Sequence, residues 1–443
     1  MLVLGRHAGE GIKDPDTLWH VLAGDHLRST WQFVGPDPFS DFTTKPWILG
    51  QWLPELVMSL THQWFGLQGV AWLAQAGRVL VCLSLYTACR REAGPLPASV
   101  VAALAVLGTA SSLSPRPQLV GFVLLAIVVS AWLATARDLR VRWWVVAVQW
   151  VWACSHGTWV VGVLVGFVVV AGLLLDRRVT PRGAMRLALV AALSLAVAAA
   201  TPLGLQVFRS FTEVRAVSPY IEEWQRPPLW EPSSLALIGL ALITLAGWLA
   251  HRELVSWGAV GLVAAGAAWG LLYGRGVALG AIIIAPLAAR ALHGVLRRDR
   301  PAWSREPVVL GVAVLVSLVI SGLYAAVGPT APAGVPSGLG PQLRALPHDA
   351  VVYNDDLLGG WLMWSFPELR HTADTRVELY GRAYAVDYLT AMSGGSDAAG
   401  IVARRHPAAV LVKDDSKLEQ ALQRNGGWRV VGDDAGYVLL LPS

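Results

Sequence analysis

Charged residues and cysteines are both scarce in this 443-residue chain, and each shortage excludes a class of protein. Only 15% of the residues are charged and 55% are hydrophobic, and the mean hydropathy is +0.51. Soluble domains carry about 25% charged residues, so the composition excludes an ordinary soluble protein and a disordered one. It indicates a polytopic membrane protein. The 21 tryptophans agree with this, because Trp concentrates at membrane–water interfaces.

The few cysteines and lysines narrow the classes further. Cys82, Cys89 and Cys154 all lie in apolar stretches. Cys82 and Cys89 are two helical turns or roughly 10 Å apart, which is too far for a disulfide. The sequence therefore offers neither a disulfide framework nor a cysteine-based metal site. Only four of the 35 basic residues are lysine, and we interpret this bias as the mark of a GC-rich bacterial genome.

Apolar segments able to cross about 30 Å of hydrocarbon recur along the chain. Ten segments are predicted as spans, with 142–155 the shortest: 66–89, 94–112, 117–136, 142–155, 157–175, 184–201, 232–250, 254–272, 275–293 and 307–327. The predicted fold class is therefore an α-helical polytopic membrane bundle of about ten spans.

Arginine is distributed unevenly over the connections between these spans. Alternate connections hold fifteen arginines on one side, Arg297, Arg298 and Arg300 among them, and five on the other. By the positive-inside rule the richer side is cytoplasmic. We therefore predict a multi-pass protein of the bacterial cytoplasmic (inner) membrane, with residues 1–65 and the tail after 328 outside. Because no signal peptide precedes that exported first segment, we expect a further transmembrane helix ahead of it.

Residues 329–443 change in character after a Pro- and Gly-rich linker. The segments AVVYNDD, PAAVLVKDD, WRVVGDD and GYVLLLP predict short strands, and LEQALQRNG predicts a helix closed by Gly. The alternation in 374–381 predicts an edge strand and turn. The chain thus divides into an outer loop with an acidic motif (1–65), a transmembrane bundle (66–328) and an outward-facing soluble α/β domain (329–443).

The first outer loop is the densest polar region of the chain. Asp14, Asp16, His20 and Asp37 lie there beside Trp19. Paired carboxylates at the mouth of an apolar bundle either accept a proton from an attacking hydroxyl or hold a divalent cation against a phosphate. The structural alternative is that Asp14 and Asp16 cap a helix over 17–27. A cap needs one Asp and explains neither His20 nor Asp37. Asp14, Asp16, His20 and Asp37 are therefore the catalytic candidates. The sequence also allows a divalent cation, bound by these carboxylates, as a cofactor.

Three arginines are candidate ligands of a lipid phosphate. Arg78 stands thirteenth in a 24-residue apolar span, and Arg116 and Arg275 lie in tight turns on the outer side. Guanidinium groups suit phosphate because they present a planar fork of donors. For Arg78 the alternative is a structural hydrogen bond to backbone carbonyls, and for the other two it is snorkelling to the headgroups.

A further set of residues has the character of a carbohydrate site, in which an aromatic ring covers the sugar face and carboxylates bind hydroxyls. Glu223 and Trp224 lie together in an outer loop, and His156 lies in an outer hairpin, where an interfacial structural role is the alternative. The residues predicted to bind the acceptor or sugar are Trp19, His156, Glu223, Trp224, Asp374 and Arg376.

The order of several short motifs resembles a family of large bacterial membrane proteins classed as GT-C-type glycosyltransferases. The motifs are Asp-Pro-Asp-x-x-Trp-His, Pro-Asp-Pro-Phe-Ser, Arg-Pro-Gln, His-Gly, Thr-Pro-Leu-Gly, Glu-Glu-Trp and Asp-x-Arg-x-Glu-Leu-Tyr-Gly. The resemblance implies transfer of a sugar from a polyprenyl-phosphate donor on the outer face, with a first-loop acid as general base. Carried over by position, that base is Asp16 or Asp14, with Asp37 as a second acid. Leu18 departs from the pattern, which tends to have Trp there.

Three functions remain open from the sequence. The first is a membrane glycosyltransferase with a polyprenyl-phosphate sugar as donor and a glycan, lipid or protein of the cell envelope as acceptor. The second is a transporter or flippase for a lipid-linked sugar, and the third is a non-catalytic envelope assembly protein. Nothing suggests a nucleic-acid partner. Convergence of Asp16, Arg116 and Arg275 on one outward cavity would favour the first.

Overall fold

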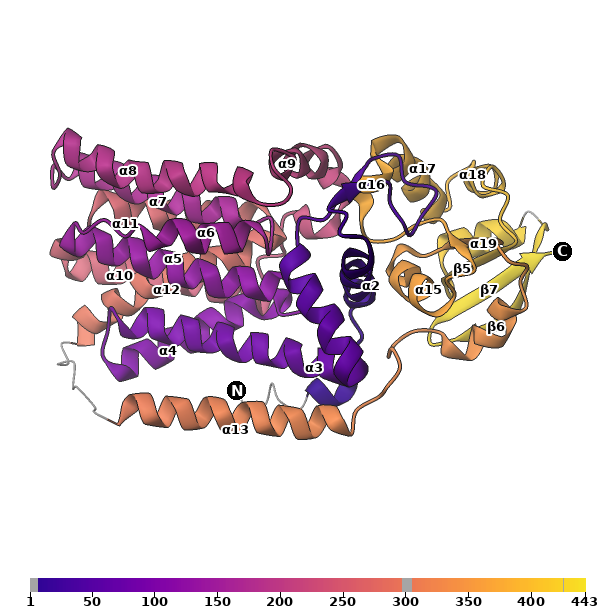
Figure 1. The fold of residues 1–443 in the computed structure, drawn as a ribbon, viewed down its shortest axis with the longest axis horizontal. Coiled ribbons are helices and arrows are strands. Elements are labelled where there is room, and N and C mark those ends of the chain that lie inside the picture. Colours follow the sequence, from indigo (N-terminus) through magenta and orange to yellow (C-terminus); the bar gives the residue numbers. More distant parts are fainter. Residues whose placement is uncertain (1–6, 297–304, 425) are drawn as a thin grey trace.

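The computed structural model describes residues 7–296, 305–424 and 426–443; the predicted cytoplasmic residues Arg297, Arg298 and Arg300 lie outside these ranges. Ten apolar helices lie side by side in a bundle (Figure 1). They are α3 (Trp52–Arg90), α4 (Pro95–Thr109), α5 (Gln118–Asp138), α6 (Trp144–Ala153), α7 (Trp159–Leu175), α8 (Pro181–Ala196), α10 (Pro232–Ala250), α11 (Trp257–Leu272), α12 (Gly274–Leu296) and α13 (Glu306–Ala326).

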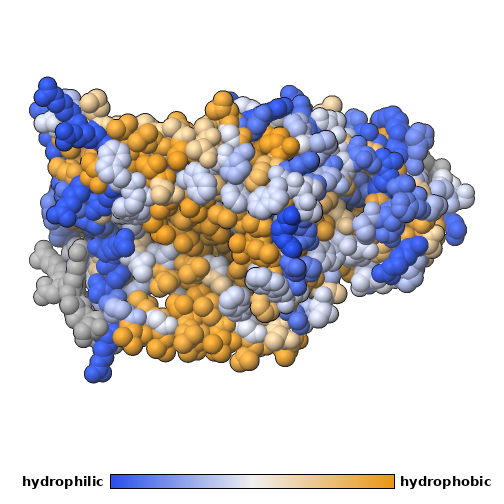
Figure 2. All heavy atoms as spheres, in the orientation of Figure 1, coloured by the Kyte–Doolittle hydropathy of each residue, from blue (hydrophilic) through white to orange (hydrophobic). Residues whose placement is uncertain are grey.

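Each predicted span corresponds to one of these helices. Seven helices of the described chain are long and apolar enough to cross a membrane, and α6, α7 and α11 are shorter apolar helices. Hydrophobic side chains cover the visible face of the bundle between a hydrophilic end and the more polar C-terminal domain (Figure 2). This is the surface that a lipid bilayer requires.

Helix α12 lies in the middle of the bundle. All its residues from Gly276 to Ala289 are buried, and it packs against α10, α11 and α4. Its contact with α11 is close, because a Cβ atom at Gly280 would lie 2.3 Å from the carbonyl oxygen of Gly266. Small residues let membrane helices approach in this way. The tight packing fixes the N-terminus of α12, which carries Arg275.

Helix α3 is broken at Gly66, the residue at which the sequence predicts the bundle to begin. Gly66 has φ 62° and ψ −165° inside the helix, a conformation that costs a residue with a side chain. A Cβ atom there would meet nothing within 4 Å, so the backbone angle, and not space, requires glycine. The part of α3 before Gly66 packs against the preceding helix at the end of the bundle (Figure 1).

The first loop lies between the bundle and the C-terminal domain (Figure 1). It contains α2 (Pro15–Thr30) and the antiparallel pair β1 (Val34–Gly35) and β2 (Trp47–Ile48). Helix α2 packs against α3 and against α15 (Gly359–Ser365), where a Cβ atom at Gly360 would lie 2.4 Å from the carbonyl oxygen of Pro15. The first loop and the C-terminal domain therefore share one hydrophobic core.

The C-terminal domain is built on a five-stranded sheet of order β4-β3-β5-β7-β6, parallel among β4, β3 and β5 and antiparallel from β5 to β6. The strands are β3 (Val351–Asn354), β4 (Arg370–His371), β5 (Ala409–Lys413), β6 (Trp428–Asp434) and β7 (Tyr437–Pro442). The remaining α-helices are α9 (Gln206–Val217), α14 (Gly340–Arg344), α16 (Val377–Tyr380), α17 (Arg382–Met392), α18 (Ala398–Ala403) and α19 (Lys417–Arg424).

Four of these strands and α19 match the predicted elements, and the prediction of an edge strand over 374–381 is wrong. The segment turns at Asp374, whose carboxylate accepts the backbone N–H of Arg376 at 2.8 Å, and it continues as the short helix α16. Such an Asx turn competes with extended structure. The outer strand β4 escaped prediction because two residues are too short to show an alternating pattern.

Candidate functional site

Asp14 begins α2 and caps it. Its carboxylate accepts the backbone N–H groups of Asp16 at 3.0 Å and Thr17 at 3.2 Å, and Pro15 occupies the first helical position. The capping alternative is therefore correct for Asp14. Both carboxylate oxygens of Asp14 also accept Nε–H of Arg116, at 3.0 and 2.8 Å.

Arg116 joins the capped helix to the bundle. Its guanidinium lies 2.8 Å from Asp14, 2.7 Å from Asp16 and 3.2 Å from Glu223. The hydroxyl of Thr17 donates to the carbonyl of Pro115 at 3.0 Å, which holds the Arg116 turn against α2. Burial alone would lower the pKa of Arg116, but the surrounding carboxylates raise it. Burial raises the pKa of Asp14, and Arg116 opposes that shift.

Glu223 extends the cluster to the last buried helix of the bundle. It pairs with Arg275 at the start of α12 as well as with Arg116. Arg275 also lies over the ring of Trp224, 6.0 Å from its centroid. Glu223 and Arg275 keep 44% and 40% of their side chains exposed, whereas Arg116 keeps 15%. The cluster is thus closed at Arg116 and accessible at Arg275.

Asp16 contacts both Arg116 and the C-terminal domain. One oxygen pairs with Arg116, and the other accepts the hydroxyl of Thr375 from the C-terminal domain. Thr375 in turn accepts the indole N–H of Trp19 at 3.2 Å. The structure therefore brings Asp16, Arg116 and Arg275 into one cluster, although they lie in three separate regions of the sequence.

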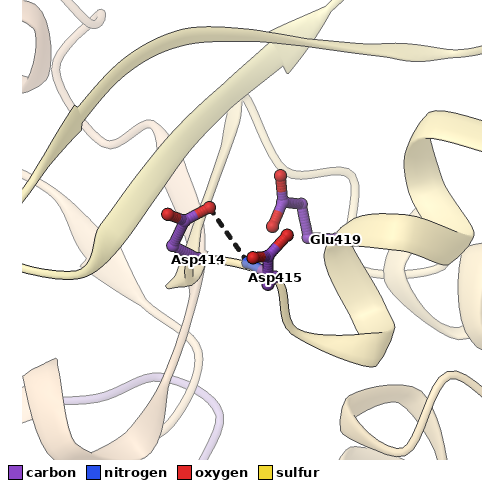
Figure 3. Close-up of side chains that lie close together, drawn as sticks. All are labelled: Asp414, Asp415 and Glu419. Carbon is purple, nitrogen blue, oxygen red and sulfur yellow. Dashed lines mark hydrogen bonds between the residues drawn. The ribbon is translucent and has the colours of Figure 1, made fainter.

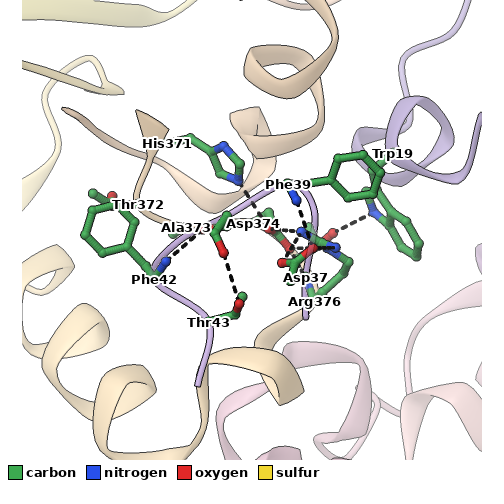
Figure 4. Close-up of polar contacts among 12 residues, drawn as sticks. Trp19, Asp37, Phe39, Phe42, Thr43, His371, Thr372, Ala373, Asp374 and Arg376 are labelled. Carbon is green, nitrogen blue, oxygen red and sulfur yellow. Dashed lines mark hydrogen bonds and ion pairs between the residues drawn. The ribbon is translucent and has the colours of Figure 1, made fainter. Parts of the chain in front are cut away.

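Arg376 occupies the centre of a second, fully buried cluster (Figure 4). Its guanidinium binds Asp37 through two hydrogen bonds of 2.9 and 3.1 Å and binds Asp374 at 2.8 and 2.9 Å. Asp374 also accepts the hydroxyl of Tyr380 at 2.7 Å and lies 3.4 Å from His371. The cluster fastens the first loop to the C-terminal domain.

The electrostatics of this second cluster follow from its burial. Burial alone would raise the pKa of Asp374, but Arg376 and His371 hold it well below its usual range. Burial raises the pKa of Asp37 in spite of Arg376. The two carboxylates raise the pKa of Arg376 although burial opposes them. The guanidinium is therefore permanently charged, and its charge is matched inside the protein.

His20 and Glu55 form a buried pair in which Nδ1 and Oε1 lie 2.8 Å apart and each side chain is 2% exposed. Burial lowers the pKa of His20 although Glu55 opposes the shift, so the imidazole is neutral near pH 7. The second oxygen of Glu55 has no hydrogen-bond partner among the described residues. Glu55 therefore presents a carboxylate oxygen that a ligand hydroxyl could satisfy.

A cavity adjoins this pair. It encloses about 470 Å³, part of it open to solvent, and Trp19, Glu55, Arg376 and Glu378 contribute to its lining. Burial raises the pKa of Glu378. Thr375 connects the cavity to the Asp16 cluster because it bonds both Asp16 and the lining residue Trp19. An indole ring with carboxylates and a guanidinium around one cavity is suited to a polar ring-shaped ligand such as a sugar.

Two further predicted residues, Arg78 and His156, bond groups outside the cluster of Asp16, Arg116 and Arg275. Arg78 donates to the backbone carbonyl of Leu113 at 2.7 Å and pairs with Gln75, which is the structural contact weighed as its alternative. Nδ1 of His156 lies 2.9 Å from the hydroxyl of Thr158. Burial, with Arg275 and His20 nearby, lowers the pKa of His156 to about 3. The imidazole is therefore neutral at working pH.

Several residues of these clusters are absent from the predicted set, His371 and Thr17 among them. Glu55 is the one acidic residue in the first turn of α3, and an acid at the start of an apolar helix was the available signal. Thr375 stands between two predicted residues, Asp374 and Arg376. Glu378 and Tyr380 follow in the same motif but carry no spacing that distinguishes them from surface residues.

Asp14, Asp16 and Asp37, the first-loop carboxylates at which a divalent cation is predicted, each pair with a guanidinium. Within the described chain, one group of three or more His, Cys or acidic side chains has all its ligand atoms within 4.8 Å of one another, and it lies in the C-terminal domain at the start of α19 (Figure 3). It consists of Asp414, Asp415 and Glu419, and two of the three are exposed.

The comparisons with known proteins concern the fold. No family model and no curated protein sequence matches the chain. Among solved structures, the oligosaccharyltransferase of Archaeoglobus fulgidus in the apo form matches with TM-score 0.56 and 13% identity over 91% of this chain and 66% of its own. ArnT from Cupriavidus metallidurans in the apo state matches with TM-score 0.54 and 17% identity over 99% of this chain and 96% of its own. Its complex with undecaprenyl phosphate gives TM-score 0.52 and 14% identity over 99% of this chain and 96% of its own.

These similarities show a GT-C fold, as the order of the motifs predicted, and the chain is a multi-pass membrane protein. The predicted fold class, a helical membrane bundle with a C-terminal α/β domain, is confirmed. The chain spans slightly less than two thirds of the archaeal enzyme and nearly the whole of ArnT.

Proposed function

We propose that the protein transfers a sugar from a polyprenyl-phosphate donor to an acceptor at the outer face of the cytoplasmic membrane. The GT-C fold supports a transferase, and one solved structure with this fold holds undecaprenyl phosphate. The observation that carries the proposal is the convergence of Asp16, Arg116, Glu223 and Arg275 at one end of the bundle. In such a cluster a basic group can bind the donor phosphate, and an acidic group can accept the proton of the acceptor hydroxyl in the same reaction.

In the proposed reaction the acceptor hydroxyl attacks the anomeric carbon of the donor. The new carbon–oxygen bond forms as the bond to the phosphate oxygen breaks, and the polyprenyl phosphate leaves with the bonding electrons. Asp16 takes the hydroxyl proton, and the configuration at the anomeric carbon inverts. The sugar occupies the cavity lined by Trp19, Glu55 and Glu378, which adjoins Asp16 through Thr375.

The two outer arginines have different roles in this proposal. Arg116 is largely buried and saturated by carboxylates, so it positions Asp14 and Asp16. Arg275 is more exposed and pairs with the exposed Glu223, so its guanidinium is the one that a lipid phosphate can reach. Arg78 supports the turn before Arg116 through Leu113.

The direct test of this function is transfer of isotope-labelled sugar. Purified protein would be incubated with a panel of polyprenyl-phosphate hexoses and pentoses and with delipidated envelope glycan. We expect label to move to the glycan from one donor of the panel. Label that stays on the lipid with every donor, while the lipid itself binds, would contradict the proposal.

Arg275→Lys should weaken the binding of polyprenyl phosphate roughly tenfold. Lysine keeps the charge but offers only a point contact in place of two parallel hydrogen bonds. The measurement is a titration of the lipid into nanodisc-embedded protein. The control is Arg226→Lys, in the outer connection between α8 and α10, for which we expect no change. Equal affinities for both variants would assign Arg275 to simple interface anchoring.

The proposed orientation places the C-terminal domain outside. In a variant lacking native cysteines, Ser337→Cys should react with a membrane-impermeant maleimide in intact cells, and Arg178→Cys should react only after permeabilisation. Both positions are exposed, so reactivity reports the side of the membrane. The reverse pattern would overturn the assignment made from the arginine distribution.

A further inference from the structure

A second cleft lies on the other side of α16 from the cavity. Val377 and Tyr380 of α16 line the cleft, whereas Glu378 and Leu379 line the cavity. The cleft has a volume of about 380 Å³, part of it open to solvent. We call it the tyrosine cleft; the residues that define it here are Tyr220, Asp356, Tyr380, Tyr384, Tyr388 and Leu389.

The aromatic walls of the tyrosine cleft are fixed by hydrogen bonds from their hydroxyl groups. Tyr384 donates to the carbonyl of Thr372 at 2.5 Å, and the hydroxyl of Tyr388 accepts the backbone N–H of Asp356 at 2.8 Å. Tyr380 donates to the buried Asp374. Because the hydroxyls are engaged at the protein, the rings that line the cleft are held in a fixed orientation. Tyr380 packs beside Tyr384 with ring centroids 5.0 Å apart, and Arg405 lies over the Tyr384 ring, 4.4 Å from its centroid.

One carboxyl group accompanies these rings. Asp356 lines the cleft, and its Oδ1 lies 3.3 Å from the hydroxyl of Tyr388. Burial, together with the neighbouring Asp355, raises the pKa of Asp356 to about 6. A carboxyl group whose surroundings resist charge is better suited to the neutral hydroxyls of a ligand than to a cation.

The cleft reaches the reaction site along one loop. Tyr220 belongs to the 218–224 segment that also carries Glu223, the partner of Arg116 and Arg275. Three residues span at most roughly 11 Å, so the backbone at Tyr220 lies within that distance of the backbone at Glu223. The hydroxyl of Tyr220 accepts Nε–H of Arg382 at 3.1 Å, which ties this loop to α17.

We propose that the tyrosine cleft binds the acceptor and that the acceptor is a carbohydrate. The proposal rests on the proposed transferase function, because it names the acceptor class of that reaction. Fixed tyrosine faces stack against the apolar faces of sugar rings, and Asp356 hydrogen-bonds sugar hydroxyls. Because the cleft is built mainly by the C-terminal domain, the acceptor approaches from the aqueous side, while the donor approaches from the membrane.

The test measures binding without any reaction. Saturation-transfer NMR would titrate methyl α-D-mannopyranoside, methyl β-D-galactopyranoside and methyl α-D-arabinofuranoside onto the full-length protein in nanodiscs. We expect at least one glycoside to bind, and Tyr384→Ala to weaken it roughly tenfold. Tyr384→Phe keeps the ring and should bind as the native protein does. Val386→Ala changes an exposed residue of the same helix and should have no effect.

Tyr220→Ala provides a second variant outside the C-terminal domain, in case Tyr384→Ala fails to fold, and it should weaken the same glycoside. Absence of glycoside binding to the native protein would overturn the proposal. So would native affinity for the glycoside in both Tyr384→Ala and Tyr220→Ala. Binding of N-acetyl-lysine methylamide in place of any glycoside would overturn it in favour of a cationic acceptor. Polyprenyl phosphate binding is measured on the same samples; its loss with glycoside binding intact would reject the transferase and not the cleft.

Discussion

Asp16→Asn is expected to lower the rate of sugar transfer by roughly 10²- to 10⁴-fold, because the amide cannot accept the proton of the acceptor hydroxyl. The substitution should remove the basicity of the side chain and leave its contacts in place. An Asn at position 16 can turn its carbonyl oxygen toward Arg116 and donate from its amide to the hydroxyl of Thr375, so both contacts of Asp16 survive. Polyprenyl phosphate binding should therefore stay close to the native value.

Two further variants show whether the effect belongs to position 16. Asp25→Asn removes another carboxylate of α2, one that bonds Ser59 and Arg28 at the opposite end of the helix, and it should retain near-native turnover. Asp14→Asn weakens the N-cap of α2 and removes the ion pair between Asp14 and Arg116. If Asp14→Asn abolishes turnover and Asp16→Asn does not, the base is Asp14. Near-native rates in both would make the acidic motif structural.

The sequence was sufficient for those parts of the fold that depend on local pattern. Ten runs of apolar residues predicted ten helices, because the length and hydropathy of a span are properties of the segment itself. The cap at Asp14 was also foreseeable, since an N-cap acts within three residues. The break of α3 at Gly66 coincides with the start of the predicted span, but the helical part before it was not predicted.

The pairings inside the site depend on docking, which local pattern does not contain. Asp37 and Arg376 are 339 residues apart in the sequence, and Asp14 and Arg116 are 102 apart. The sequence could not predict whether Arg116 and Arg275 lie close to Asp16; it could say only that such an arrangement would favour a glycosyltransferase. For Arg78, position along the span suggested a site inside the membrane, but only the neighbouring helix end could show the carbonyl of Leu113 that it bonds.

Arg376→Ala is expected to destabilise the protein by about 3–5 kcal/mol, the largest effect on folding predicted for any single site. It leaves Asp37 and Asp374 buried, both with side chains 0% exposed, and without their common cation. Thermal unfolding in detergent should show a large fall in the transition temperature. The control is Arg404→Ala, which removes an exposed pair with Asp397 in the same domain and should change stability by less than about 1 kcal/mol.

The pH dependence of the same variant separates lost charge from lost packing. Without Arg376, burial raises the pKa of both aspartates above the unfolded value of about 3.9. The native state then binds more protons than the unfolded state between these pKa values, so stability rises as the pH falls through that range. Arg376→Ala should therefore recover part of its stability at pH 5 relative to pH 8, and Asp37→Asn combined with Asp374→Asn should restore part of it at pH 8. A deficit that is equal at both pH values would mean that Arg376 acts through its packing against Trp19 and Phe39, and not through its charge.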